Sequence, residues 1–387
     1  MDFPKKLQQK LEGRKAVNAL RKLGSQNNLI DFSSNDYLGF SKNETIFKAT
    51  HDFLIGHRIS QNGATGSRLL SGNHPLYSVV ESVLCNFHKS EAALIFNSGY
   101  DANVGFFSCV PQKDDIILYD EYIHASIRDG ITMSLAKSYK FKHNDIEALE
   151  NMMLRHSKPV SESHQNIYIV TESVFSMDGD SPDLIRLSEI CKKNNAYLIV
   201  DEAHAIGSLG KHGVGLIQDL KLESQVFARL ITFGKALGCH GAAILGSDNL
   251  KQYLINFSRS FIYTTALPPH SLATINAAYN ELISTQNGVL LKRNIIHFKS
   301  EITKNNLQHL FIISNSSIQC CIISGNERVK SIAKKLREFH FDVKPILSPT
   351  VPKGQERLRF CLHSYNSTKE ISDVLQQLAT FATTMTC

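Results

Sequence analysis

Short runs of β-branched and aromatic residues alternate along this chain with amphipathic segments long enough to form helices. The runs lie at 92–96, 115–119, 166–171, 197–201, 228–233 and 242–246. Helix-length segments such as 75–88 and 182–194 separate them. Because strands that alternate with helices usually pair in parallel, this pattern predicts an α/β protein with a mostly parallel central sheet.

The pattern changes near residue 282, where a long helical stretch begins. Strands at 317–323 and 357–362 then flank a helix at 331–339, which predicts a smaller C-terminal α+β domain. A chain of 387 residues also exceeds the usual size of a single core. We therefore expect three parts: an N-terminal helical arm at 1–45, a large domain at 46–282 and a small domain at 283–387.

The composition excludes several classes of protein. The net charge of +6 is spread along the chain without a Lys/Arg block, which argues against nucleic-acid binding. The first 23 residues have no signal-peptide pattern, and no apolar run approaches the roughly 20 residues of a membrane span. The eight cysteines are scattered without metal-ligand spacing. We expect a cytoplasmic protein with reduced cysteines and no metal site.

The segment 197–204, Tyr-Leu-Ile-Val-Asp-Glu-Ala-His, is the most informative one for function. An apolar strand ends there in Asp201, and His204 follows three residues later. Ligands of open α/β sheets bind at the carboxyl ends of the strands. One interpretation is structural: Asp201 caps a helix beside a surface histidine. Another is the Asp-Glu-Ala-His box of helicase-like nucleotide hydrolases.

The nucleotide interpretation requires a phosphate-binding loop of the form G-x-x-x-x-G-K-[ST] earlier in the chain. The sequence contains none. The nearest candidate, Gly234-Lys235, has Arg229 in place of the first glycine and Ala236 in place of the hydroxyl residue, and it lies downstream.

A third interpretation makes Asp201 the partner of a protonated pyridine nitrogen. Lys235, at the end of the next strand, would form an imine with the aldehyde of pyridoxal phosphate. A buried carboxylate favours the charged ring nitrogen, and burial would free the lysine amine for imine chemistry. His204 could hydrogen-bond the phenolic oxygen of the ring. Alone, Lys235 would be a solvated lysine at a strand end; its position after Asp201 favours the cofactor.

The cofactor phosphate needs a site rich in N–H donors. Ser98-Gly99 follows the run at 92–96 and opens a helix, whose first N–H groups attract anions. A glycine turn before a helix is also common without any ligand. Thr232 and the pair Thr264-Thr265 offer further hydroxyl groups, although local backbone bonding would explain them equally well.

Together these motifs resemble the α-oxoamine synthase family, fold-type-I pyridoxal phosphate enzymes that join an amino acid to an acyl thioester. The resemblance runs nearly end to end. It rests on Phe32–Gly39 (FSSNDYLG), Gly63–Gly72 (GATGSRLLSG), Thr171–Asp180 (TESVFSMDGD), Asp201–His204, Thr232–Lys235 and Pro349–Pro352 (PTVP).

The resemblance implies the roles already indicated by the residues and adds others. It implies an aspartate aminotransferase-like fold, a cofactor-binding domain at 46–282 and a homodimer with shared active sites. It implies Lys235, His124, Asp201 and His204 as catalytic residues, with His124 stacked on the ring. It implies further cofactor contacts from Gly99, Tyr100, Ser176, Thr232 and, from a second subunit, Thr264 and Thr265. It implies substrate contacts from Arg21, Asn35, Ser67, His124 and Thr350.

Two positions bear on the substrate. Glycine-using relatives have threonine where this chain has Ser67, and the smaller side chain leaves room for the methyl group of alanine. This favours the branch of the family that joins alanine to pimeloyl-CoA or a pimeloyl carrier protein in biotin biosynthesis. Many members carry an arginine for the amino-acid carboxylate where this chain has Leu347; Asn35, His124 or a nearby arginine would have to replace it. The alternatives are a sibling synthase using glycine or serine, and an inactive partner subunit, which would usually lack the lysine.

Overall fold

The computed structural model describes residues 3–21, 23–24, 28–156 and 165–383. The chain divides into two compact units. Unit 1 contains Met1–Asn35, Met177–Asp180 and Val289–Cys387, and unit 2 contains Asp36–Ser176 and Ser181–Gly288. The expected three parts at 1–45, 46–282 and 283–387 stay a prediction.

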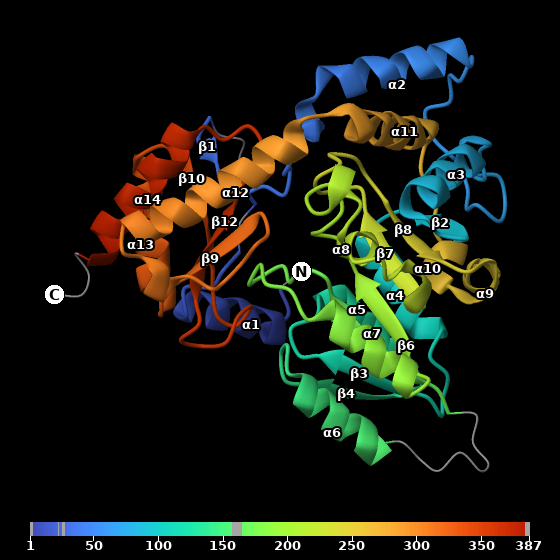
Figure 1. The fold of residues 1–387 in the computed structure, drawn as a ribbon, viewed down its shortest axis with the longest axis horizontal. Coiled ribbons are helices and arrows are strands. Elements are labelled where there is room, and N and C mark those ends of the chain that lie inside the picture. The colour runs from blue at the N-terminus through green and yellow to red at the C-terminus, as the bar shows by residue number, and fades with distance from the viewer. Residues whose placement is uncertain (1–2, 22, 25–27, 157–164, 384–387) are drawn as a thin grey trace. The chain divides into compact units, whose positions relative to one another are not determined.

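A seven-stranded sheet forms the centre of unit 2 (Figure 1). Its strands, in spatial order, are β2 (Ala92–Phe96), β8 (Ala242–Gly246), β7 (Ala228–Thr232), β6 (Tyr197–Asp201), β5 (Ile167–Glu172), β3 (Ile116–Asp120) and β4 (Lys137–Phe141). The strands from β7 to β4 run parallel, and β8 is antiparallel to both of its neighbours. All six strands predicted in this unit are present within one residue of their expected bounds.

Successive residues of the central strands supply two separate cores. Ile117 of β3 and Ile199 of β6 pack in one buried cluster, whereas their neighbours Leu118 and Val200 pack in the other. This alternation follows from the two-residue repeat of a strand. The sheet is therefore buried on both faces, as parallel sheets usually are.

Helices cover this sheet, and several begin at a polar capping residue. The helices of unit 2 are α2 (Glu44–Gly56), α3 (Leu76–His88), α4 (Gly99–Cys109), α5 (Ala125–Met133), α6 (Ile146–His156), α7 (Leu184–Lys193), α8 (Leu216–Asp219), α9 (Asp248–Phe257), α10 (Arg259–Ile262) and α11 (Pro269–Ser284), with short 3₁₀ turns at Phe40–Lys42, Lys211–Gly213 and Glu223–Gln225. The side chain of Asp183 accepts the Arg186 N–H, so α7 begins two residues after the expected Pro182. Ser98 caps α4 in the same way.

Unit 1 has its own small sheets and helices. Its strands are β1 (Ile30–Asp31), β9 (Ile318–Ile322), β10 (Phe341–Asp342), β11 (Lys344–Ile346) and β12 (Arg357–Cys361), and its helices are α1 (Lys5–Ala16), most of α12 (Asn287–Lys304), α13 (Asn326–Glu338) and α14 (Thr368–Thr383), with a 3₁₀ turn at Gln308–Leu310. The antiparallel order is β11-β12-β9, and β1 pairs with β10 in parallel. The helix expected at 331–339 begins at Asn326, five residues earlier, with Glu327 favourably placed in its first turn.

These features confirm the predicted fold class, with a mostly parallel central sheet and helices. Among the described residues, no helix combines the length and the apolar character that a membrane crossing needs.

Candidate active site

The three neighbouring parallel strands β5, β6 and β7 each end in or just before polar residues at the same edge of the sheet. Asp201 is the last residue of β6, and it lies in register with Glu172, the last residue of β5. β7 ends at Thr232, three residues before Lys235. Since β5, β6 and β7 are parallel, their carboxyl ends meet at this edge, where ligands of open α/β sheets bind.

The carboxylate of Asp201 is buried and held by two donors. Asn103 of α4 donates from Nδ2 to Oδ2 over 2.9 Å, and the Ala203 N–H donates to Oδ1 over 2.9 Å. The side chain remains only 7% exposed. A carboxylate held in this way presents its oxygens at a fixed position, where a protonated ring nitrogen could be bound.

His204 is held by a residue that the sequence analysis quoted in a motif but assigned no role. The hydroxyl group of Tyr37 lies 2.7 Å from Nδ1 of His204, and both side chains are buried. This hydrogen bond orients the imidazole and engages one of its nitrogens. The predicted contact to a phenolic oxygen would come from Nε2.

His124 precedes α5 and caps it. Its Nδ1 lies 2.7 Å from Ser126 Oγ and 3.2 Å from the Ser126 backbone N, and its own backbone N–H donates to Glu172 Oε1 over 2.5 Å. Burial lowers the pKa of His124, and the nearby Lys235 charge adds to this effect, whereas Asp201 acts in the opposite direction. The predicted catalytic residues Asp201, Lys235 and His124 therefore share one electrostatic environment.

Glu172 is a second buried carboxylate at this edge, and the sequence analysis missed it. Burial raises its pKa well above the ordinary value, the charge of Asp201 raises it further, and Lys235 opposes the shift. Two carboxylates beside one lysine make the proton distribution here sensitive to each of the three groups. The only sequence signal for Glu172 was its place in the Thr171–Asp180 motif.

The start of α4 faces the end of β7. A Cβ atom added to Gly99 would lie 3.8 Å from Thr232 Cβ and Oγ1. The Ser98 hydroxyl accepts the Asp101 N–H over 3.0 Å, which leaves the N–H groups of the preceding positions for a ligand. The predicted phosphate contacts Gly99 and Thr232 are therefore adjacent. Tyr100 is 51% exposed, and its hydroxyl donates to Asp129 over 2.6 Å.

Thr264 and Thr265 lie beside the turn between β2 and α4 of their own chain. Asn97 donates from Nδ2 to Thr264 Oγ1 over 2.9 Å and to the Thr265 carbonyl over 2.6 Å. The next residue, Ala266, donates its N–H to the Gly66 carbonyl over 2.9 Å. Ser67 therefore belongs to the same region as these threonines. Their contact with a second subunit stays a prediction.

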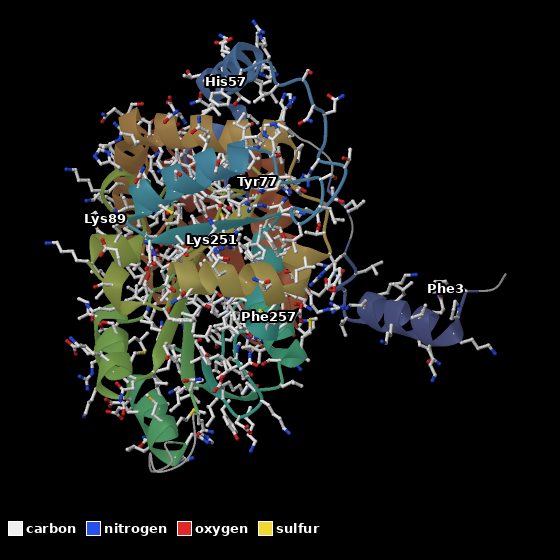
Figure 2. All side chains as sticks on the ribbon, turned by 90° about the vertical axis from the view of Figure 1, so that its right-hand side faces the viewer. Phe3, His57, Tyr77, Lys89, Lys251 and Phe257 are labelled. Atoms are coloured by element: carbon white, nitrogen blue, oxygen red, sulfur yellow. The ribbon has the colours of Figure 1, made fainter. Side chains whose placement is uncertain are left out.

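Arg68 anchors the loop that carries Ser67. Its guanidinium group lies 3.8 Å from the ring centre of Tyr77 and donates to Glu81 over 2.6 Å. Lys251 of α9 donates to the other oxygen of Glu81, over 2.8 Å (Tyr77 and Lys251 are labelled in Figure 2). These contacts hold the backbone at Ser67 against α3. Ser176, another predicted cofactor contact, is the last residue of unit 2 before Met177.

The remaining predicted substrate contacts lie in unit 1. Arg21 and Thr350 are exposed. Asn35 is partly buried, and its Oδ1 accepts a hydrogen bond from Arg359 over 3.0 Å. Arg359 had no role in the sequence-based prediction. The signal was present: a charged residue within an apolar strand is costly unless a partner or ligand compensates it.

The donor set fits pyridoxal phosphate. The N–H groups at the start of α4 could bind a phosphate beside Thr232, whose hydroxyl group donates to the Gly241 carbonyl over 3.2 Å, and Asp201 provides an acceptor for a ring N–H. His204 is oriented by Tyr37 for a polar substituent on the ring. Lys235 brings a primary amine into the electrostatic environment of Asp201.

Comparison with known proteins identifies the family of this chain. The model of the family "Aminotransferase class I and II" matches residues 27–378. The fold and the site thus define an enzyme that depends on pyridoxal phosphate, as predicted. A curated 8-amino-7-oxononanoate synthase from Emericella nidulans is 38% identical over 368 residues, covering 91% of this chain and 89% of the relative.

Solved structures extend the comparison. The 8-amino-7-oxononanoate synthase of Francisella tularensis is 30% identical with a TM-score of 0.78, covering 94% of this chain and all of that one. A serine palmitoyltransferase from Sphingomonas wittichii is 25% identical with a TM-score of 0.89, covering 99% of both chains. The chain therefore belongs to the aminotransferase class I and II family and, within it, to the α-oxoamine synthases.

Proposed function

We propose that the protein joins L-alanine to a pimeloyl thioester, either pimeloyl-CoA or a pimeloyl carrier protein. The products would be 8-amino-7-oxononanoate, carbon dioxide and the free thiol, and the reaction would serve biotin biosynthesis. The observation that carries this proposal is the nearly full-length similarity to two proteins named 8-amino-7-oxononanoate synthase. The grouping of Lys235, Asp201 and His124 at one sheet edge supplies the chemistry.

When bound, pyridoxal phosphate supplies an electron-accepting ring that stabilises negative charge on the α-carbon of the amino acid. Asp201 would hold the ring nitrogen in its protonated form. The amine of Lys235 would hold the cofactor and would be the base for the α-proton. His204, oriented by Tyr37, and Ser176 would hydrogen-bond the phenolic oxygen. His124 would lie against the ring and would hydrogen-bond the incoming thioester carbonyl.

The N–H groups at Gly99 and Tyr100 would hold the phosphate together with Thr232. Thr264 and Thr265 of a second subunit would complete this seat in a homodimer with shared active sites. The exposed residues Arg21 and Thr350 would contact the substrates. The protein would act in the cytoplasm.

Arg359 is our candidate for the group that binds the carboxylate of the amino acid, in place of an arginine at Leu347. Its guanidinium group has a planar fork of donors that matches a carboxylate. Asn35, to which it donates, would complete the site. Arg359 is only 8% exposed, and burial strengthens such an interaction because water competes less.

Replacing Arg359 with lysine should raise the KM for alanine by about ten- to a hundredfold, because a point charge loses the two-pronged contact. The kcat should change less. Steady-state kinetics with alanine as the varied substrate measure the effect. The matched control is Arg357→Lys: Arg357 is buried in the same strand but pairs with Asp178, so this variant should lose thermal stability and keep its KM. An unchanged KM in Arg359→Lys would remove this residue from the carboxylate site.

Ser67 supports alanine as the amino acid, since its small side chain leaves room for a methyl group. Incubation of the purified protein with pyridoxal phosphate, alanine and pimeloyl-CoA should release thiol and form a product with the mass of 8-amino-7-oxononanoate. No thiol release under these conditions, with pimeloyl carrier protein tested as well, would refute the proposed substrates.

A sibling activity is the second candidate, because the serine palmitoyltransferase of Sphingomonas wittichii aligns over 99% of this chain. Parallel assays with glycine, alanine and serine, each with short and long acyl-CoA donors, separate the two. A higher kcat/KM with serine and a long acyl chain would favour the sibling.

A further inference from the structure

We propose that Asn103 and Ser126 are positioning residues that hold the imidazole of His124 as a neutral ring with its proton on Nε2, through a hydrogen-bond chain that begins at Asp201. The inference rests on the proposed function only for the roles of Asp201 and His124. Asn103 and Ser126 had no assigned role in the sequence analysis, and neither is expected to touch the substrate or the cofactor.

The hydrogen-bond chain consists of three successive hydrogen bonds within unit 2. Nδ2 of Asn103 lies 2.9 Å from Asp201 Oδ2 and 3.0 Å from Ser126 Oγ. Ser126 Oγ in turn lies 2.7 Å from His124 Nδ1. Asn103 is 2% exposed and Ser126 is 1% exposed, so water does not compete for these bonds. These hydrogen bonds therefore connect Asp201 of β6, by way of Asn103 of α4, to His124, which caps α5.

The direction of each hydrogen bond follows from chemistry. An ionised carboxylate accepts and never donates, so Asn103 must present its NH₂ group to Asp201. The second hydrogen of the same NH₂ group reaches Ser126 Oγ. A hydroxyl oxygen that accepts this hydrogen still has its own proton to donate to His124 Nδ1, and the other contact of Nδ1 decides this direction.

Nδ1 receives a second donor. The backbone N–H of Ser126 also lies 3.2 Å from it, and this group cannot reverse its direction. A ring nitrogen that accepts hydrogen bonds carries no proton, so in a neutral ring the proton is on Nε2. Protonation of Nδ1 would place its hydrogen against the Ser126 N–H.

This arrangement leaves one polar atom of Asn103 without a hydrogen bond among the described residues. Its Oδ1 is buried and has no hydrogen-bond partner among the described residues. Turning the amide over would bring this oxygen against Asp201, which is worse because both groups only accept. An asparagine with an unpaired buried oxygen is unfavourable for folding, which suggests that its donor group serves another purpose.

The charged groups around His124 come from several elements. Asp201 and Glu172 lie on β6 and β5, Lys235 follows β7, and Arg128 and Asp129 belong to α5. Burial has a larger effect on the pKa of His124 than any of these charges. It lowers this pKa, in agreement with the two donors at Nδ1. A neutral ring with Nε2–H can donate a hydrogen bond to a carbonyl or carboxylate oxygen throughout the neutral pH range.

NMR of the full-length protein labelled with ¹⁵N-histidine tests the proposal without substrate. The His124 signals can be assigned from their absence in His124→Gln. We expect Nδ1 unprotonated and Nε2 protonated at neutral pH in the wild type. A proton on Nδ1 at neutral pH would overturn the proposal, whatever the enzyme's substrates prove to be.

Variants give a second test. Ser126→Ala should shift the titration of His124 and the acidic limb of the pH profile of kcat/KM to higher pH, because one donor to Nδ1 is lost. Ser126→Thr, which keeps the hydroxyl group, should restore both. An unshifted titration in Ser126→Ala would show that the hydroxyl group does not set the state of the ring.

Buried asparagines offer a matched comparison. Asn294 of α12 is 0% exposed, donates through Nδ2 to backbone carbonyls and also has an unpaired Oδ1 among the described residues. Asn103→Ala should alter the His124 signals, whereas Asn294→Ala should leave them unchanged at a similar loss of thermal stability. Equal His124 signals in the two variants would contradict the proposed chain.

Discussion

Replacing Lys235 with alanine should lower kcat by at least about a thousandfold, because in the proposed mechanism one amine both holds the cofactor and accepts the α-proton. The variant should also lose the covalent bond to the cofactor. Intact mass spectrometry after borohydride reduction detects this bond as an added mass in the wild type. The same sample should show no added mass in Lys235→Ala.

Lys137→Ala is the control for this experiment, since Lys137 is an exposed lysine of β4 in the same unit. It should keep both the turnover and the added mass. A Lys235→Ala protein that still turned over at the wild-type rate and still gained the reduced cofactor would contradict the assignment of this lysine.

Replacing Asp201 with asparagine should lower kcat by roughly a hundred- to a thousandfold, because the carboxylate proposed to keep the ring nitrogen protonated is lost. The substitution preserves the shape of the side chain and the acceptor for the Ala203 N–H. Cofactor binding should weaken much less than turnover. Single-turnover kinetics and a cofactor titration of the same preparation separate the two effects.

Asp115→Asn is a matched control for a buried aspartate. Asp115 is 2% exposed and accepts the backbone N–H groups of Gln112 and Asn166, each over 2.8 Å, at the opposite end of the parallel strands. This variant should lose thermal stability and keep its kcat. If Asp201→Asn lost no more turnover than Asp115→Asn, Asp201 would be a structural residue only.

Much of the fold of unit 2 could be predicted because its strands are continuous apolar runs. β4 was missed: Lys-Ser-Tyr-Lys-Phe (137–141) lies at the edge of the sheet, pairs on one side only and is mostly not buried. An edge strand has no need of a continuous apolar sequence, so the pattern carried no signal. β1 and β10 are two-residue strands, too short for any periodicity to appear.

The residues of the candidate site also fall into those that local sequence could predict and those that it could not. Asp201 and Lys235 could be predicted because each follows an apolar run closely, so local sequence indicates that it lies at a strand end. The residues that hydrogen-bond to the site residues could not be predicted, because the partners in these hydrogen bonds are distant in sequence. Tyr37 and His204 are 167 positions apart, Asn103 and Asp201 are 98 apart, and Asn35 and Arg359 are 324 apart.

The chain passes between the two units four times, at residues 35–36, 176–177, 180–181 and 288–289. The contribution of Met177–Asp180 to unit 1 is specific: the Gly179 carbonyl accepts hydrogen bonds from Ser314 and Ser316, over 2.7 and 2.8 Å. A contiguous fragment from residue 289 to the end would lack both these four residues and β1. Unit 1 is therefore not a transferable module: a recombination event that exchanged only the C-terminal part of the gene would combine pieces of two incomplete units.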